Sequence, residues 1–279
     1  MTNTQLRIIS ALVLTLIFAV AFMLGKTGLF SLLLMTGIFL IDEVMNKMIK
    51  VKRLNFNYIF SMISFVFLMV YVQFIDNNNE YFQYLFKTGA LINFVFLIYL
   101  FFEKMDSKVF ISALRKNSYI IGFIFLTSLT SILYIINQEN WGNLILLMFV
   151  INFSVDTGAW FFGRRYGNRK IWPSVSPKKT INGSIGGSIL SVVISSVFSF
   201  YFIGKLNYMI ILSIFGLTIL AQLGDFFESK LKRQVGVKDS SKLIPGHGGI
   251  YDRIDSLVFI APFYAVSYTH LTLPTTPYV

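Results

Sequence analysis

Long apolar segments alternate with short polar ones along almost the whole chain. A helix needs about 20 mostly apolar residues to cross the hydrocarbon core of a membrane. Segments that meet this requirement lie at residues 8–24, 28–46, 58–75, 85–102, 119–136, 141–163, 184–204 and 208–227. A ninth begins at Ser256 with LVFIAPFYAV, which is too short to cross as a helix. The pattern predicts an all-α integral membrane protein, a polytopic bundle of eight to nine transmembrane helices.

The composition supports this class. Hydrophobic residues make up 55% of the 279 residues, and the chain contains 30 Phe. The first apolar segment is longer than the apolar region of a signal peptide, so we interpret it as a transmembrane helix. The chain has no cysteine, which excludes disulfides, thiolate metal sites and a cysteine nucleophile.

Basic and non-basic loops alternate between the apolar segments. The basic loops lie at 47–53, 104–116, 164–179 and 230–253, and the loops between them carry at most one cation. By the positive-inside rule the basic loops face the cytoplasm. We therefore expect a multi-pass protein of the cell membrane with its N-terminus inside.

The formal net charge of +11 raises the question of nucleic-acid binding. The positive charge sits in short loops between apolar segments, however, where membrane topology and anionic headgroups favour it. We therefore expect membrane lipids as partners and no nucleic acid.

The most polar long stretch runs from Gly224 to Ser256. At its start, Asp225, Glu228, Ser229 and Lys232 are spaced i, i+3, i+4 and i+7, which places them on one face of a helix. Carboxylates near a membrane face the bundle interior or a wet cavity, because contact with lipid is costly. The alternative is a salt-bridged helix end at the interface, with Glu228 paired to Lys232.

The same stretch continues with a glycine-rich loop, PGHGG, that ends just before Asp252 and Asp255. Such backbone can present N–H groups to phosphate. Carboxylate oxygens suit Mg²⁺, which takes one or two carboxylates together with substrate phosphates. The alternative is a structural loop in which Asp255 or Ser256 caps the last helix.

A third polar region lies in and after the sixth apolar segment. Asn152 and Asp156 share a helix face, Asp156 lies well inside the apolar run, and a buried intramembrane carboxylate indicates a functional site. The loop that follows contains SPKKT, in which Lys178 and Lys179 suit anionic phosphates. The alternatives are an internal ion pair for Asp156 and a purely topological role for the cations.

Together, carboxylates for a metal and cations for phosphates indicate phosphoryl or nucleotidyl transfer onto a lipid at the cytoplasmic face. These features leave the nucleotide and the lipid open.

The stretch SKLKRQVGVKDSSKLIPGHGGIYDRID resembles the signature of the phosphatidate cytidylyltransferases, also called CDP-diacylglycerol synthases. The match runs through Ser229, Lys232, Arg233, Lys238, Asp239, Pro245, His247, Gly248, Gly249, Asp252, Arg253 and Asp255. The segments around Asp156, Gly163 and Gly167, and SPKKT, are also similar, so the resemblance covers residues 140–260.

The resemblance implies transfer of the cytidylyl group of CTP to phosphatidate, with release of pyrophosphate, in phospholipid biosynthesis. It also implies Mg²⁺ held by Asp225 and Asp252, with Asp255 or Asp156 nearby, and a homodimer. The implied catalytic residues are Asp225, Lys232, Asp252 and Arg253. The implied substrate-binding residues are Lys178, Lys179, Ser229, Arg233, Lys238, His247, Gly248 and Gly249.

Two positions depart from the family pattern: Asn182 replaces a usual Glu, and Ser241 replaces a commoner Gly. We divide the chain into N-terminal transmembrane helices (1–139), a catalytic transmembrane region (140–267) and a tail of doubtful origin (268–279). The rival functions are a CTP-dependent polyprenol or dolichol kinase, and a membrane transporter with Asp156 in an ion path.

Overall fold

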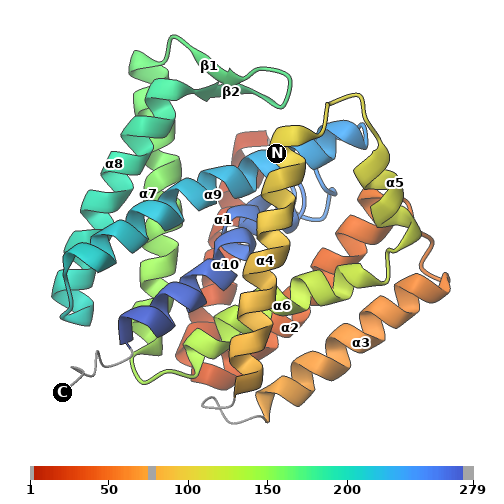
Figure 1. The fold of residues 1–279 in the computed structure, drawn as a ribbon, viewed down its shortest axis with the longest axis horizontal. Helices are drawn as coiled ribbons and strands as arrows, with labels where there is room; N and C mark the ends of the chain where they lie inside the picture. The colour runs from red at the N-terminus through yellow and green to blue at the C-terminus, as the bar shows by residue number, and fades with distance from the viewer. Residues whose placement is uncertain (1–2, 75–79, 273–279) are drawn as a thin grey trace.

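The computed structural model describes residues 3–74 and 80–272, and helices account for most of them (Figure 1). In the first half these are α1 (Asn3–Met23), α2 (Gly25–Asp42) with its π-helical extension η1 (Glu43–Met48), α3 (Phe56–Gln73), α4 (Glu80–Phe102), α5 (Val109–Lys116) and α6 (Ile120–Ile136). The second half contains α7 (Trp141–Tyr166), β1 (Lys170–Trp172), β2 (Ser176–Thr180), α8 (Ile181–Phe198) with η2 (Ser199–Ile203), α9 (Tyr208–Gln234) and α10 (Tyr251–Thr272).

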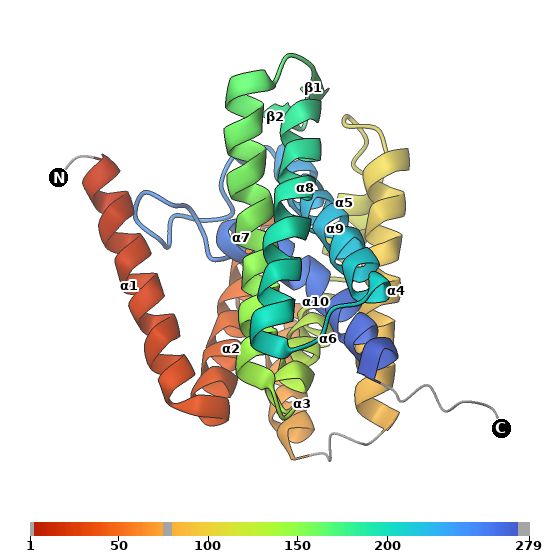
Figure 2. The same cartoon turned by 90° about the vertical axis from the view of Figure 1, so that its left-hand side faces the viewer.

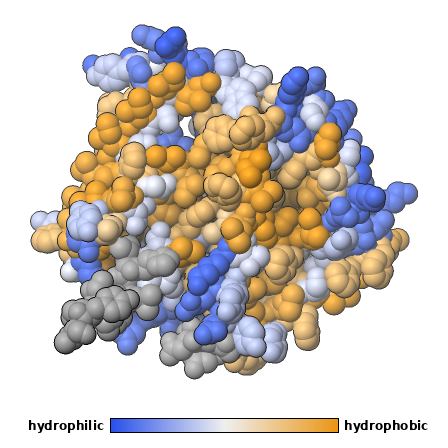
Figure 3. Space-filling model, in the orientation of Figure 1, coloured by the Kyte–Doolittle hydropathy of each residue, from blue (hydrophilic) through white to orange (hydrophobic). Residues whose placement is uncertain are grey.

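The predicted fold class is confirmed. In the described part of the chain, 7 helices are long and apolar enough to cross a membrane, or up to 8 if α5 and α6, bent by 94°, form one span. Apolar side chains cover the middle of the face shown in Figure 3, and hydrophilic residues gather towards its edges. Exposed residues such as Leu12 (65%) and Leu16 (64%) on α1 are of the kind that lipid covers.

A two-stranded antiparallel hairpin, β1–β2, follows α7, where the sequence analysis predicted only a loop. Its turn is anchored by Val175, which is 0% exposed and packs with Leu100 of α4 and Phe226 of α9. Thr180 ends the hairpin and caps α8 by accepting a hydrogen bond from the Gly183 N–H at 3.2 Å. The hairpin is therefore held against α9, although it projects beyond α7 and α8 in Figure 1.

Helices α7 and α8 pack closely side by side because small residues line their contact (Figures 1 and 2). A Cβ atom added to Gly158 would lie 2.8 Å from the Gly187 Cα, and one added to Gly183 would lie 2.7 Å from the Ala159 carbonyl oxygen. Substitution at either glycine would force the helices apart, and with them the hairpin that joins them.

The last helix differs from the prediction. It begins at Tyr251, before the expected Ser256, and continues to Thr272, so the helix is longer than its apolar run. Pro262 lies inside it, and Asn93 of α4 donates a hydrogen bond of 2.7 Å to the Phe259 carbonyl one turn earlier. Residues 273–279 of the predicted tail lie outside the described residues.

The loop between α9 and α10 reaches across to α1, which leans away from α7 at the end nearest the N-terminus (Figure 2). Arg7 donates to the Gly246 carbonyl at 3.0 Å, and Ser10 lies 3.0 Å from the Pro245 carbonyl oxygen. The polar loop is therefore held between the first helix and the last.

Candidate active site

The polar face predicted for the end of α9 is confirmed. Ser229 donates a hydrogen bond to Asp225 at 3.3 Å, and the Lys232 ammonium lies 2.5 Å from the Glu228 carboxylate. In each pair the two residues are one helical turn apart, as the i and i+4 spacing requires. The Glu228–Lys232 pair is the contact that the interfacial salt-bridge alternative also predicted.

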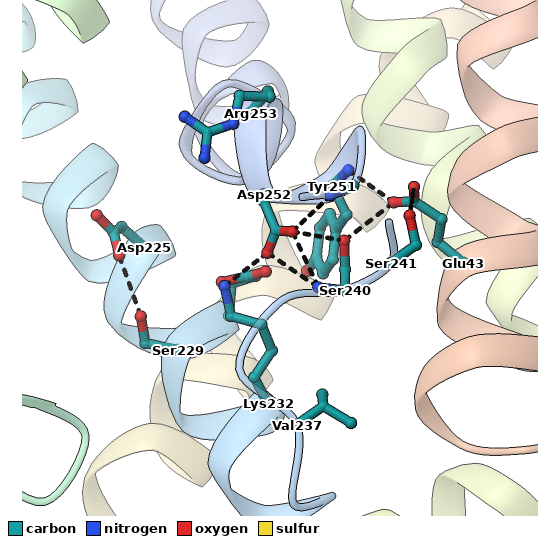
Figure 4. A network of polar contacts seen from close by, with 12 residues as sticks. Glu43, Asp225, Ser229, Lys232, Val237, Ser240, Ser241, Tyr251, Asp252 and Arg253 are labelled. Carbon is teal, nitrogen blue, oxygen red and sulfur yellow. Dashed lines mark hydrogen bonds and ion pairs between the residues drawn. The ribbon is translucent and has the colours of Figure 1, made fainter. Parts of the chain in front are cut away.

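That alternative does not account for the second partner of Lys232. Its ammonium also lies 2.7 Å from Asp252, at the start of α10, and points into the network drawn in Figure 4. The side chains of Lys232, Glu228 and Asp252 are 12%, 2% and 4% exposed. One buried cation therefore joins two carboxylates from different helices.

Asp252 is held from its other side by the loop that precedes α10. The Ser240 N–H donates to it at 2.9 Å, and the Gly249 N–H donates at 2.7 Å. The Ser240 hydroxyl lies 3.0 Å from the same carboxylate. Both oxygens of Asp252 are thus used by protein donors.

Two of the three glycines of the PGHGG loop, Gly248 and Gly249, are needed for this close approach. Gly248 has a φ of +91°, and a Cβ atom there would lie 2.4 Å from an Asp252 oxygen. A Cβ atom on Gly249 would lie 2.0 Å from the Ser240 hydroxyl. The Gly248 N–H bonds to the Ile244 carbonyl at 3.1 Å, so in this structure both glycine N–H groups have protein partners.

Glu43, which the sequence analysis did not select, contacts the same loop. Glu43 is the first residue of η1, directly after α2, and the residue is 2% exposed. The Ser241 hydroxyl donates to it at 2.7 Å, and the N–H groups of Ile250 and Tyr251 donate at 2.9 Å each. Ser241, one of the departures from the family pattern, therefore has a definite partner.

The hairpin brings Lys179 to Asp225. Their charged atoms are 2.5 Å apart, and the side chains are 28% and 29% exposed. The Lys179 ammonium also lies 4.5 Å from the centre of the Phe226 ring. Lys178 is exposed, as expected for the neighbour of Lys179 on a strand, where successive side chains alternate between faces.

Asp156 is exposed in the structure, and the expectation that it is buried was wrong. It nevertheless lies near the site, because it interacts electrostatically with Asp225, Lys179 and Arg253. Asn152, one turn earlier, is buried, and its side-chain oxygen has no hydrogen-bond partner among the described residues. Of the two residues on this helix face, Asp156 therefore lies nearer to the polar site.

Several predicted site residues lie at the edge of this network. Arg253 donates two hydrogen bonds to the His247 carbonyl, at 3.1 and 2.8 Å. The His247 ring nitrogen Nδ1 lies 2.7 Å from the Ser10 hydroxyl. Partial burial, followed by the positive charges of Arg253 and Arg7, lowers the pKa of His247 below its ordinary value. Arg233, Lys238 and Asp239 are exposed.

A second residue without a sequence signal is Lys230. It is 0% exposed, and its ammonium donates to the carbonyls of Tyr99 and Leu100 at 2.9 Å each, at the C-terminal end of α4. A third bond of 2.5 Å goes to the Glu103 carbonyl. A cation is favoured there because the helix end carries partial negative charge. Lys230 thus fixes α4 against the side of α9 opposite to Asp225.

The carboxylates can be compared with the requirements of Mg²⁺. No group of three or more His, Asp or Glu side chains is arranged to hold a metal ion within residues 3–74 and 80–272. Mg²⁺ does not need such a group, since one or two carboxylates and substrate phosphates suffice. The side chain of Asp225 is 29% exposed, whereas that of Asp252 is 4% exposed. Asp255 lies close enough to Asp225 to interact with it electrostatically. These hard oxygen donors fit a Mg²⁺ ion shared with phosphates.

The fold and the site together define a polytopic membrane protein with a polar site of paired carboxylates and cations, suited to a phosphate-bearing substrate. The sequence matches the cytidylyltransferase family over residues 5–271. The chain belongs to that family.

Three relatives are named phosphatidate cytidylyltransferase. One from Staphylococcus haemolyticus (strain JCSC1435) is 32% identical over 262 residues, which cover 92% of this chain and 96% of that protein. One from Bacillus subtilis (strain 168) is 36% identical over 204 residues, covering 63% and 75%. One from Staphylococcus aureus (strain COL) is 44% identical over 119 residues, covering 42% and 46%. The family resemblance inferred from the sequence is therefore confirmed.

Proposed function

We propose that the protein transfers the cytidylyl group of CTP to phosphatidate, giving CDP-diacylglycerol and pyrophosphate. The family supports this reaction, and so do the names of the relatives. The observation that carries the proposal is the Lys179–Asp225 pair, because it is partly open and its Asp225 lies two turns before Lys232 of the enclosed Lys232–Asp252 pair on α9.

In the proposed reaction, an oxygen of the phosphatidate phosphate attacks the α-phosphorus of CTP. The new bond joins this oxygen to phosphorus, and the bond between the α-phosphorus and the bridging oxygen breaks. That oxygen leaves with pyrophosphate. The attacking phosphate is already an anion, so the step requires no general base, and its barrier is lowered by positioning and by neutralising charge.

The chain offers two kinds of cation for this task. Lys178, Arg233 and Lys238 are exposed and can meet the phosphates of CTP directly. Lys179 is held at Asp225, and Lys232 is enclosed between Glu228 and Asp252. We propose that Lys179 contacts phosphate when Asp225 takes part in metal binding, and that Lys232 keeps the two helices in register.

Mg²⁺ would be held by Asp225, with Asp252, Asp255 and Asp156 around it. When bound, it would neutralise the charge that develops on the phosphate oxygens. In this structure Asp252 is fully engaged by Lys232 and the loop, so an incoming ion can reach the partly open Asp225 more easily than Asp252.

We further propose that the site faces the cytoplasm, where CTP is available, and that the N-terminus lies on the same side. The alternation of basic and non-basic loops supports this orientation. Association of two copies, which the family resemblance implies, stays a prediction.

Purified protein in detergent should be incubated with phosphatidate, Mg²⁺ and CTP labelled in either the cytosine ring or the γ-phosphate. We expect the cytosine label in the lipid product, the γ-label in pyrophosphate, and no conversion when EDTA is added. Lipid that carries the γ-label without cytosine would instead show a kinase. If a range of phosphatidates gives no labelled lipid and proteoliposomes show ion flux, the transporter hypothesis would replace the proposal.

A further inference from the structure

The N-terminal helices contribute a carboxylate to the loop that positions the site. Glu43 accepts hydrogen bonds from the backbone N–H groups of Ile250 and Tyr251, at 2.9 Å each. These two residues stand at the start of α10, where unpaired N–H groups carry partial positive charge and favour an anion. The Glu43 carboxylate therefore acts as the N-terminal cap of the helix that carries Asp252.

The same carboxylate also fixes the preceding part of the loop. Ser241 donates its hydroxyl hydrogen to Glu43 at 2.7 Å, and the Ser240 hydroxyl lies between Glu43, at 3.1 Å, and Asp252, at 3.0 Å. Figure 4 shows Glu43 and Asp252 on opposite sides of Ser240. The two carboxylates are thus connected through a single hydroxyl.

The glycine between these groups shows how closely the arrangement is built. A Cβ atom on Gly249 would lie 2.6 Å from each Glu43 oxygen. No side chain fits between the loop and the carboxylate, so the loop must follow Glu43 closely.

We infer that Glu43 is a positioning residue, which holds the 240–251 loop in the conformation that aims Asp252 at Lys232 and the substrate. The catalytic consequence rests on the proposed function, whereas the structural one does not. No contact between Glu43 and substrate is implied.

The structural part is tested by hydrogen exchange of the Ile250 and Tyr251 amides, measured by mass spectrometry on the protein in detergent. Glu43→Gln preserves the size of the side chain but replaces one acceptor oxygen with a donor. We expect these amides to exchange about tenfold faster, as is typical when a hydrogen bond to a charged acceptor is lost. Unchanged exchange would overturn the inference.

Asp42→Asn is the matched control. Asp42 is the adjacent carboxylate, and its partners lie elsewhere: it accepts two hydrogen bonds of 2.8 Å from Arg53 and one of 2.9 Å from Tyr58. This variant should leave the exchange of Ile250 and Tyr251 and the turnover of CTP unchanged. An equal effect of both variants would mean a general loosening of α2 and would overturn the assignment.

The catalytic part is tested by kinetics. A displacement of about 1 Å at Asp252 can reduce turnover by about 100-fold, so we expect that fall in kcat for Glu43→Gln. We also expect a rise of about tenfold in the Mg²⁺ concentration that gives half-maximal rate, because Asp252 is a proposed ligand. A smaller folded fraction would lower the apparent kcat without moving the Mg²⁺ dependence, and that result would refute positioning.

Ser241→Ala provides a milder variant should Glu43→Gln fail to fold, because it removes one of the hydrogen bonds and adds no donor. It should show the same changes with smaller amplitude, and wild-type exchange together with wild-type kinetics would contradict the proposal. If the wild-type protein makes no cytidine-labelled lipid, the proposed function fails, yet the exchange experiment still decides the role of Glu43 in the fold.

Discussion

Replacement of Lys232 by Met tests whether the carboxylates of α9 and α10 depend on one buried cation. The ammonium lies 2.5 Å from Glu228 and 2.7 Å from Asp252. Met is similar in length and apolar, so the substitution removes the charge with little change in packing. Two enclosed carboxylates would then face each other without a counter-charge.

The exposed fractions decide the expected magnitude. A solvent-exposed ion pair contributes about 0–1 kcal/mol to stability, whereas removal of one partner from a buried pair costs about 3–5 kcal/mol. The side chains of Lys232, Glu228 and Asp252 are 12%, 2% and 4% exposed, so the buried case applies. For a chain of this size, about 2–4 °C per kcal/mol gives a fall in Tm of at least about 6 °C.

The assay is thermal unfolding of the purified protein in detergent, followed by intrinsic fluorescence. In the Lys232→Met background, Glu228→Gln removes one of the two unpaired charges and should restore about half of the lost stability. Lys242→Met is the control, because Lys242 is exposed in the same polar stretch. A Tm of Lys232→Met within about 2 °C of wild type, with no recovery in the double variant, would refute the reasoning.

Three further predictions concern the metal, the histidine and the orientation. Asp225→Asn should lower the rate of CTP-dependent lipid conversion by about 100-fold or more, measured as cytidine-labelled lipid, because the accessible carboxylate is lost. Burial and the charges of Arg253 and Arg7 lower the pKa of His247, so the folded protein disfavours its charged form and loses stability as the pH falls below 6.5. We therefore expect the Tm of wild type minus the Tm of His247→Gln to decrease when the pH is lowered from about 7.5 to about 5.5. A difference that does not change with pH would contradict this. Because the chain has no cysteine, Ser174→Cys and Lys205→Cys can each be labelled alone in sealed vesicles, and an impermeant reagent should reach them from opposite sides.

The features that sequence predicted well depend on local spacing. Membrane-length helices follow from runs of apolar residues, and the pairs on α9 follow from the i and i+4 geometry of any helix. The start of α10 was placed too late because the first turn, from Tyr251 to Asp255, is polar. That turn is helical because Glu43 and Lys232 satisfy its polar groups, and neither contact has a local signal.

The features that sequence missed depend on contacts between distant segments. Glu43 lies 197 positions before Ser240, and Lys230 lies 130 positions after Leu100, so no periodicity could connect them. Yet both residues hold a helix that carries the proposed site: Glu43 caps the start of α10, which carries Asp252, and Lys230 joins α9, which carries Asp225, to the last carbonyls of α4. The hairpin adds a third such contact, because Val175 in its turn brings Lys179 to Asp225. Residues of η1 and α4, which belong to the predicted N-terminal region, therefore hold the elements on which the predicted chemistry depends.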